Sequence, residues 1–149
     1  MSVPDKRVTP AQAQELLGEG FSQDLASRVE ERIGVDVIVL PLEKPGYSLQ
    51  LGNRHVIVVG ATDRWFRSNF TIAHELGHIL FPSALNGGSR RDEDAANAFA
   101  AELLMPETMI RSMSWTDTNP HLIAEHVWKM GVSTQALRTR LDYLRPPVS

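Results

Sequence analysis

Two histidines four residues apart set the strongest limit on the structure of this chain, in the run His74-Glu75-Leu76-Gly77-His78. Residues at this spacing project from one face of an α-helix, about one turn apart. Two imidazole nitrogens placed in this way can reach one zinc ion, at about 2.0–2.1 Å each. Glu75 lies about 100° around the helix from His74. We therefore predict that Glu75 is not a ligand and acts as general base on a water molecule at the metal.

The composition limits which side chains can complete a metal site of this kind. Cysteine is absent from all 149 residues, which excludes thiolate ligands as well as a disulfide framework. Any further ligand must therefore be a histidine, an aspartate or a glutamate. A catalytic zinc site takes three ligands from the protein and leaves the fourth position for water, so one more ligand is needed.

An acidic segment downstream of the histidines supplies candidates for the third ligand. We predict a helix over 92–105, and Glu93 and Asn97 lie at the edge of its packed face, where a side chain can reach a neighbouring helix. Glu102 is turned away from that face. Glu93 is the predicted third ligand, and Asp92 remains a competitor for this role. The packed face itself contains Ala96, Phe99, Ala100, Leu103 and Leu104.

These residues stand in a pattern that is similar to a known family. The run 71–78, followed by Glu93, Asn97 and the run 99–106, resembles the ImmA/IrrE family of zinc metallopeptidases. The similarity is strong over about 65–106 and continues more weakly in 131–141. The resemblance implies that one zinc ion is bound by His74, His78 and Glu93, and that Glu75 is the catalytic base.

The resemblance also implies a reaction and a partner. Members of this family are typically encoded with, or fused to, a helix-turn-helix repressor of the Xre type, which they help to remove by cleavage. We therefore expect a zinc-dependent metalloendopeptidase that hydrolyses peptide bonds in such a repressor. A length of 149 residues leaves no room for a fused repressor domain, so a separate partner is expected. The alternative is a protein-binding regulator that keeps the zinc-binding fold and sequesters its partner without cutting it.

Hydrophobic patterning predicts an α+β protein: a small mixed or antiparallel sheet packed on a helical half that carries the zincin-like helix of the two histidines. One domain is expected over 1–149, with a loose leader at 1–9. Strands are predicted at 35–40, 47–51 and 55–59, the last two as a hairpin around Gly52-Asn53. Helices are predicted as one or two elements from Pro10 to near Gly34, then at 68–81, 92–105, 107–113, 120–130 and 133–144.

Two local details stay open at this point. The helix over 68–81 has two candidate N-terminal caps, Ser68 and Asn69. The strand at 55–59 is either an edge strand, able to pair with an extended substrate peptide, or an ordinary internal strand. Local sequence does not choose between these interpretations.

Charge and hydropathy argue against nucleic acid and membranes as partners. The formal net charge is -3, whereas both partners select for an excess of lysine and arginine. The helix pair at 121–144 has the outline of a helix-turn-helix, but residues 121–149 carry only four basic against two acidic residues, so structural helices are the preferred interpretation. Neither a secretory apolar region nor a membrane-length apolar stretch is visible, and we expect a cytoplasmic protein.

Overall fold

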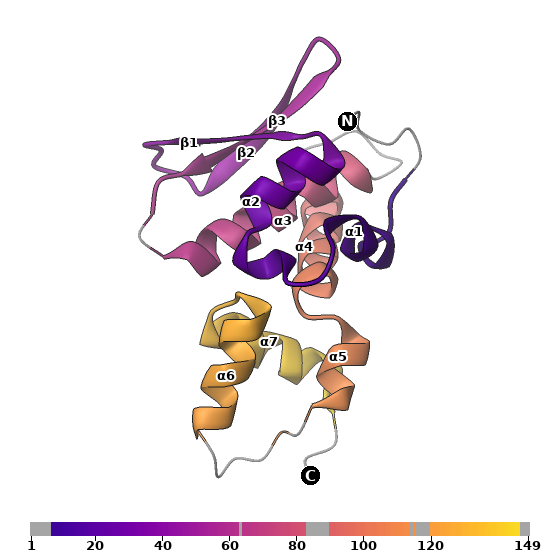
Figure 1. Ribbon diagram of the computed structural model, residues 1–149, viewed down its shortest axis with the longest axis vertical. Helices are drawn as coiled ribbons and strands as arrows, with labels where there is room; N and C mark the ends of the chain where they lie inside the picture. The colour runs from indigo at the N-terminus through magenta and orange to yellow at the C-terminus, as the bar shows by residue number, and fades with distance from the viewer. Residues whose placement is uncertain (1–6, 63, 83–89, 114, 116–119, 147–149) are drawn as a thin grey trace.

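The computed structural model describes residues 7–62, 64–82, 90–113, 115 and 120–146. It confirms the predicted α+β class, with a small sheet at one end and helices packed beneath it. Figure 1 shows α1 to α4 next to the sheet and α5 to α7 at the opposite end of the molecule. None of the helices in these ranges combines the length and the apolar character that are needed to cross a bilayer.

The sheet has three strands in the order β1-β3-β2. Strand β3 (Arg54–Gly60) pairs in parallel with β1 (Asp36–Leu40) and antiparallel with β2 (Gly46–Leu51), so the sheet is mixed. The predicted hairpin is confirmed, and Gly52 supplies the positive φ of 63° that its turn requires. Because β3 is central, the edge-strand interpretation of 55–59 is wrong, and the edges belong to β1 and β2.

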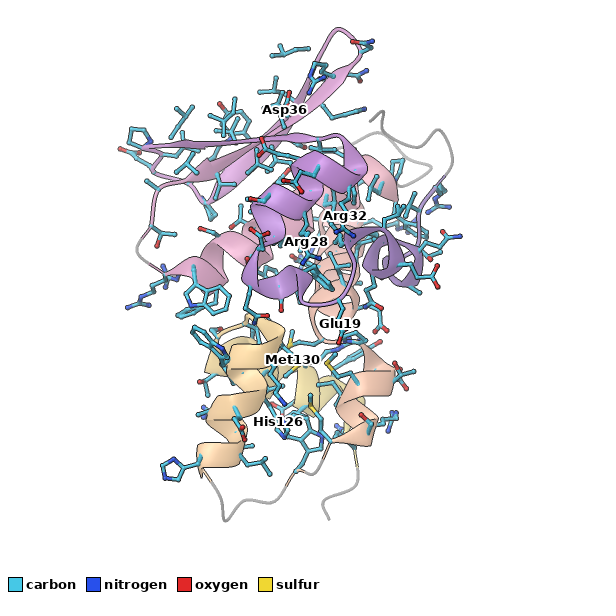
Figure 2. All side chains as sticks on the ribbon, viewed as in Figure 1. Glu19, Arg28, Arg32, Asp36, His126 and Met130 are labelled. Atoms are coloured by element: carbon cyan, nitrogen blue, oxygen red, sulfur yellow. The ribbon has the colours of Figure 1, made fainter. Side chains whose placement is uncertain are left out.

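Two short helices precede the sheet, as predicted. Helix α1 (Pro10–Leu17) begins at Thr9, whose side chain forms a capping box with Gln12. Helix α2 (Leu25–Arg28) continues as a π-helical turn and ends at Gly34, in the left-handed conformation that favours glycine. Figure 2 shows Arg28 beside the end of α1, where its Nη1 atom donates to the carbonyl oxygens of Leu17 (2.7 Å) and Glu19 (3.1 Å).

The prediction of a loose leader is wrong for residues 7–9, while residues 1–6 lie outside the described part of the chain. Val8 is 6% exposed, and its backbone N–H donates to the carbonyl of Leu80 at 2.8 Å. The Arg7 guanidinium lies 3.9 Å above the ring of Phe81. Burial of one valine and pairing of its backbone therefore attach this segment to the end of the histidine helix, which its polar sequence did not indicate.

The central pair of helices is α3 (Trp65–Leu80) and α4 (Arg90–Leu104). Helix α3 begins three residues before the predicted start, so neither Ser68 nor Asn69 is its cap. Asn69 is buried instead, and its Nδ2 donates to the carbonyls of Ser22 (2.8 Å) and Gly131 (3.0 Å). Apolar residues of α3 and α4 join those of α1, α2 and β3 in one core.

Three helices complete the chain close to their predicted positions: α5 (Glu107–Ser112), α6 (Pro120–Met130) and α7 (Thr134–Leu144). The Ser133 hydroxyl caps α7 by accepting from the N–H of Ala136 at 3.0 Å. The turn between α6 and α7 uses Gly131 with φ of 65°. The predicted C-terminal helix pair is thus present, and its tight turn meets Asn69 of α3.

Candidate metal centre

Helix α3 orients both histidines because one of its faces is apolar and buried. Ile72, Ala73 and Leu76 are at most 3% exposed and fix the helix against the core. His74 and His78 lie on the flank of that face, and their side chains are 15% and 23% exposed. Their ring centroids are 4.9 Å apart with the planes nearly perpendicular, as the spacing of one turn predicts.

The second helix approaches α3 at a glycine. A Cβ atom added to Gly77 would lie 3.0 Å from Cβ of Phe99 and 3.1 Å from its Cγ, so the side chain of α4 occupies the space that any other residue would fill. Ala100, with 0% exposure, adds a second small residue on the facing helix. Small residues at this crossing therefore let α3 and α4 approach closely enough for side chains of both helices to reach one ion.

Glu93 of α4 faces both histidines. Its Oε2 lies 2.9 Å from Nε2 of His74, and its Oε1 lies 2.9 Å from Nε2 of His78. The helical wheel placed Glu93 at the edge of the packed face, and every residue assigned to that face is at most 3% exposed. Asp92, the competing candidate, is buried at 4% exposure and is not in the group formed by these ligand atoms.

The three side chains fit a single metal ion. One ligand atom from each of His74, His78 and Glu93 lies within 4.8 Å of the other two. Two ligands at about 2.0–2.2 Å from a tetrahedral zinc ion are about 3.3–3.6 Å apart, so small side-chain rotations bring the observed atoms onto one ion. Two imidazoles and one carboxylate form a donor set suited to zinc, with a position left for water.

The contact with Asn97 sets which ring nitrogen of His74 carries the proton. Its Oδ1 lies 2.8 Å from Nδ1 of His74, one turn along α4 from Glu93. A neutral imidazole carries a single N–H, and donation from Nδ1 to Asn97 leaves Nε2 with a free lone pair. That lone pair lies next to a carboxylate oxygen, which is also an electron donor, and a cation between the two atoms satisfies both. The sequence placed Asn97 beside Glu93 but assigned it no such contact.

Glu75, the predicted general base, lies directly after His74 on α3 and is 8% exposed. Its carboxylate is not in the ligand group, which agrees with the expectation that Glu75 is not a metal ligand. Glu75 is thus a carboxylate directly after a candidate metal ligand, and a carboxylate can accept a proton from a water molecule.

Comparison with known proteins assigns the chain to a family. Residues 30–142 match the profile of the peptidase M78 family, described as the IrrE N-terminal-like domain. The chain belongs to this family. The resemblance to ImmA/IrrE proteins is thereby confirmed. No curated protein matches the sequence significantly.

A solved structure supports the fold of this M78 family member. A Mycobacterium tuberculosis transcriptional regulator matches with a TM-score of 0.56 and 19% sequence identity. The match covers 83% of this chain and 41% of the regulator, so the chain spans less than half of that protein's length. At this identity the likeness shows a shared fold.

Glu102 is turned away from the ligand group, as predicted, and it has a charged partner on another helix. Its carboxylate forms an ion pair with Arg140 of α7, which is 8% exposed and also donates from Nε to the carbonyl of Met105 at 3.0 Å. Sequence reasoning missed this pair because its members are 38 residues apart and neither shows a local signal. The pair joins α4 to the C-terminal helices.

Proposed function

We propose that this M78 family member is a zinc-dependent metallopeptidase that hydrolyses peptide bonds in a protein substrate. The observation that carries the proposal is the meeting of His74, His78 and Glu93 within 4.8 Å, beside the buried Glu75. Membership of the peptidase M78 family supports the same chemistry. The three side chains would supply the protein ligands of a catalytic zinc ion, and Glu75 would supply the adjacent carboxylate that hydrolysis by a zinc enzyme requires.

Each side chain has a distinct part in the proposed mechanism. When bound, a zinc ion supplies Lewis-acid polarisation to a substrate carbonyl and to a water molecule. His74 and His78 would hold the ion through Nε2, and Glu93 would add a carboxylate oxygen. Asn97 keeps His74 in the tautomer that ligation needs. Glu75 accepts the proton that the attacking water loses.

We further propose that the substrate is a separate helix-turn-helix repressor of the Xre type. The basis is the family to which the chain belongs and its similarity in fold to a protein described as a transcriptional regulator. A repressor substrate acts on DNA inside the cell, so this proposal also implies a cytoplasmic location for the enzyme.

Two measurements test the proposed function in sequence. Protein purified from zinc-supplemented medium should contain about one zinc per chain by elemental analysis. The protein is then incubated with an Xre-type repressor encoded beside its gene, and fragments are identified by mass spectrometry. Glu75→Gln should retain zinc and slow cleavage by at least about a hundredfold, because general-base catalysis contributes at least that much. Glu125→Gln, an exposed residue on α6, is the matched control and should cleave normally.

Two outcomes would contradict the proposal. Less than about a tenth of an equivalent of zinc under these conditions would contradict the assignment of a metal site. Zinc-loaded protein that leaves the repressor intact, together with a Glu75→Gln variant that still relieves repression in cells, would instead identify a regulator that sequesters its partner without cleaving it.

A further inference from the structure

A groove lies between α4 and α7, next to the candidate metal centre but separate from its ligands. Its volume is about 870 Å³, within the range of ligand-binding clefts. Figure 1 shows α7 behind α6 and beside α5, below the end of α4. The walls of the groove are largely apolar or small, with Ala98 and Ala101 on α4, Met105 directly after α4, and Ala136 and Leu144 on α7.

The groove adjoins the candidate metal centre at Asn97. Asn97 lines the groove and also contacts Nδ1 of His74 at 2.8 Å. Phe70, which also lines the groove, precedes His74 by one turn of α3 and therefore lies on the same side of that helix. A peptide whose scissile bond is held at His74 and His78 can thus extend directly into this groove.

The charges of the groove select against a charged occupant. Three of its lining side chains are charged at neutral pH, and each forms an ion pair with a side chain of opposite charge. Glu102 pairs with Arg140, and Glu107 pairs with Arg111 at 2.8 Å. A charged substrate side chain would have to leave water without gaining an unpaired opposite charge, which is costly. An apolar side chain gains by leaving water.

The length of the groove sets how much of a substrate it can hold. Asn97 on α4 and Met105, the residue directly after α4, both line the groove and are eight residues apart, which corresponds to about 12 Å of helix. An extended peptide advances about 3.3 Å per residue, so about three to four residues fit between the metal centre and the far end.

We propose that the groove between α4 and α7 binds an extended, apolar segment of three to four substrate residues adjoining the scissile bond. The inference rests on the proposed peptidase function for its orientation from the metal centre. It assigns selectivity to side chains on both walls, with Ala98 and Thr139 at exposed positions that face the occupant from α4 and α7.

The experiment is an NMR titration of the ¹⁵N-labelled chain with two peptides blocked at both ends, Ala-Leu-Phe-Ala and Ala-Ser-Ser-Ala. The apolar peptide should shift the amide signals of Ala98, Ala101 and Thr139. It should bind at least about tenfold more tightly than the serine peptide, because burial of one large apolar side chain is worth about that factor. Measurements with and without zinc keep the result independent of catalysis, so failure of the proposed function leaves this test intact.

Substitutions in the walls locate the binding. Ala98→Trp and Thr139→Trp place bulk in the groove from opposite sides at exposed positions, and each should weaken the apolar peptide by at least about tenfold. Ala124→Trp, at an exposed position on α6 outside the groove, is the control and should bind the peptide normally. Equal binding of the two peptides, shifts confined to other surfaces, or wall variants that bind normally would overturn the proposal. Concentration-dependent shifts of the same amides without peptide would assign the groove to self-association instead.

Discussion

At the scale of single residues, the ligand set depends on a side chain that is not a ligand. Asn97 accepts at 2.8 Å from Nδ1 of His74 and so leaves Nε2 available toward Glu93. Partners of this kind fix the orientation and the tautomer of a metal-ligating histidine. The identity of residue 97 should therefore affect metal affinity through His74 rather than through any direct bond to the ion.

Asn97→Ala should lower the affinity for zinc by about 10- to 100-fold, the usual cost of losing such a partner. Competition with a chelating dye measures this change. Asn97→Asp keeps an acceptor oxygen in place and should recover most of the affinity. Asn53→Ala, at an exposed position in the β2–β3 turn, should bind zinc normally. Equal affinities for the alanine variant of residue 97 and the parent protein would show that His74 needs no partner.

Glu93 and Glu102 lie on the same helix and should respond in opposite ways to substitution. Glu93→Ala should lose most of the bound zinc and, with it, the thermal stabilisation that zinc gives to the folded state. Glu102→Ala should keep zinc but lower the free energy of unfolding by about 1–3 kcal/mol, because the buried Arg140 loses its ion-pair partner.

Elemental analysis and thermal unfolding with and without zinc separate these two effects. The parent protein is the reference for both variants. If Asp92→Ala removes the metal while Glu93→Ala retains it, the third ligand has been assigned to the wrong side chain.

At the scale of helices and strands, local sequence predicted the features that follow from the periodicity of a helix. The packed face of α4 and the spacing of His74 and His78 follow from a repeat of 3.6 residues, and both are present. Helix α3 begins three residues before its predicted start, for a reason outside its own sequence. Trp65 in its first turn packs edge-on against Trp128 of α6, with ring centroids 5.1 Å apart. A contact between residues so distant in sequence leaves no local signal.

Local sequence could not predict the order of the strands either, because that order depends on contacts between residues that are distant in the sequence. Alternation and turn residues located the hairpin of β2 and β3, because these signals are local. The central position of β3 depends on its direct parallel pairing with β1, which places Asp36 opposite Val56 although β2 lies between the two strands in the sequence. The ion pair between Glu102 and Arg140 was missed for the same reason, since both residues read as ordinary surface charges in their own helices.

The crossing of α3 and α4 should be sensitive to side-chain size at Gly77. Gly77→Val adds atoms that meet Phe99, whose Cβ would be 3.0 Å from the new Cβ. Overpacking of this kind should lower the free energy of unfolding by about 1–3 kcal/mol and weaken zinc binding by moving Glu93 away from the histidines. Urea unfolding and zinc titration measure the two effects.

Ala98→Val introduces the same side chain at an exposed position of α4 and serves as the control for helix propensity. This substitution should change the free energy of unfolding by less than about 1 kcal/mol. A Gly77→Val protein as stable as this control would show that the helices can separate without cost.

At the scale of the whole molecule, three distant parts of the chain meet at the first turns of α3. Asn69 donates to the carbonyls of Ser22 and Gly131, which links the N-terminal helices to the α6–α7 turn. The Ser22 hydroxyl adds a bond to the carbonyl of Lys129 at 2.7 Å. The histidine helix therefore carries the two candidate metal-ligating histidines in its second half and contacts the C-terminal helices through its first half.

Asn69→Ala leaves two buried carbonyls without their donor, so it should lower the free energy of unfolding by about 1–3 kcal/mol. Gly131→Ala should also destabilise the protein, for two reasons. Its φ of 65° disfavours any Cβ, and the added atom would lie 2.6 Å from Nδ2 of Asn69. In the Asn69→Ala background the second cost disappears while the first remains. Urea unfolding of both single variants and the double variant should therefore give a double variant that is more stable than the sum of the single effects predicts, by about 0.5–3 kcal/mol. Strict additivity would show that the asparagine and the glycine do not meet in solution.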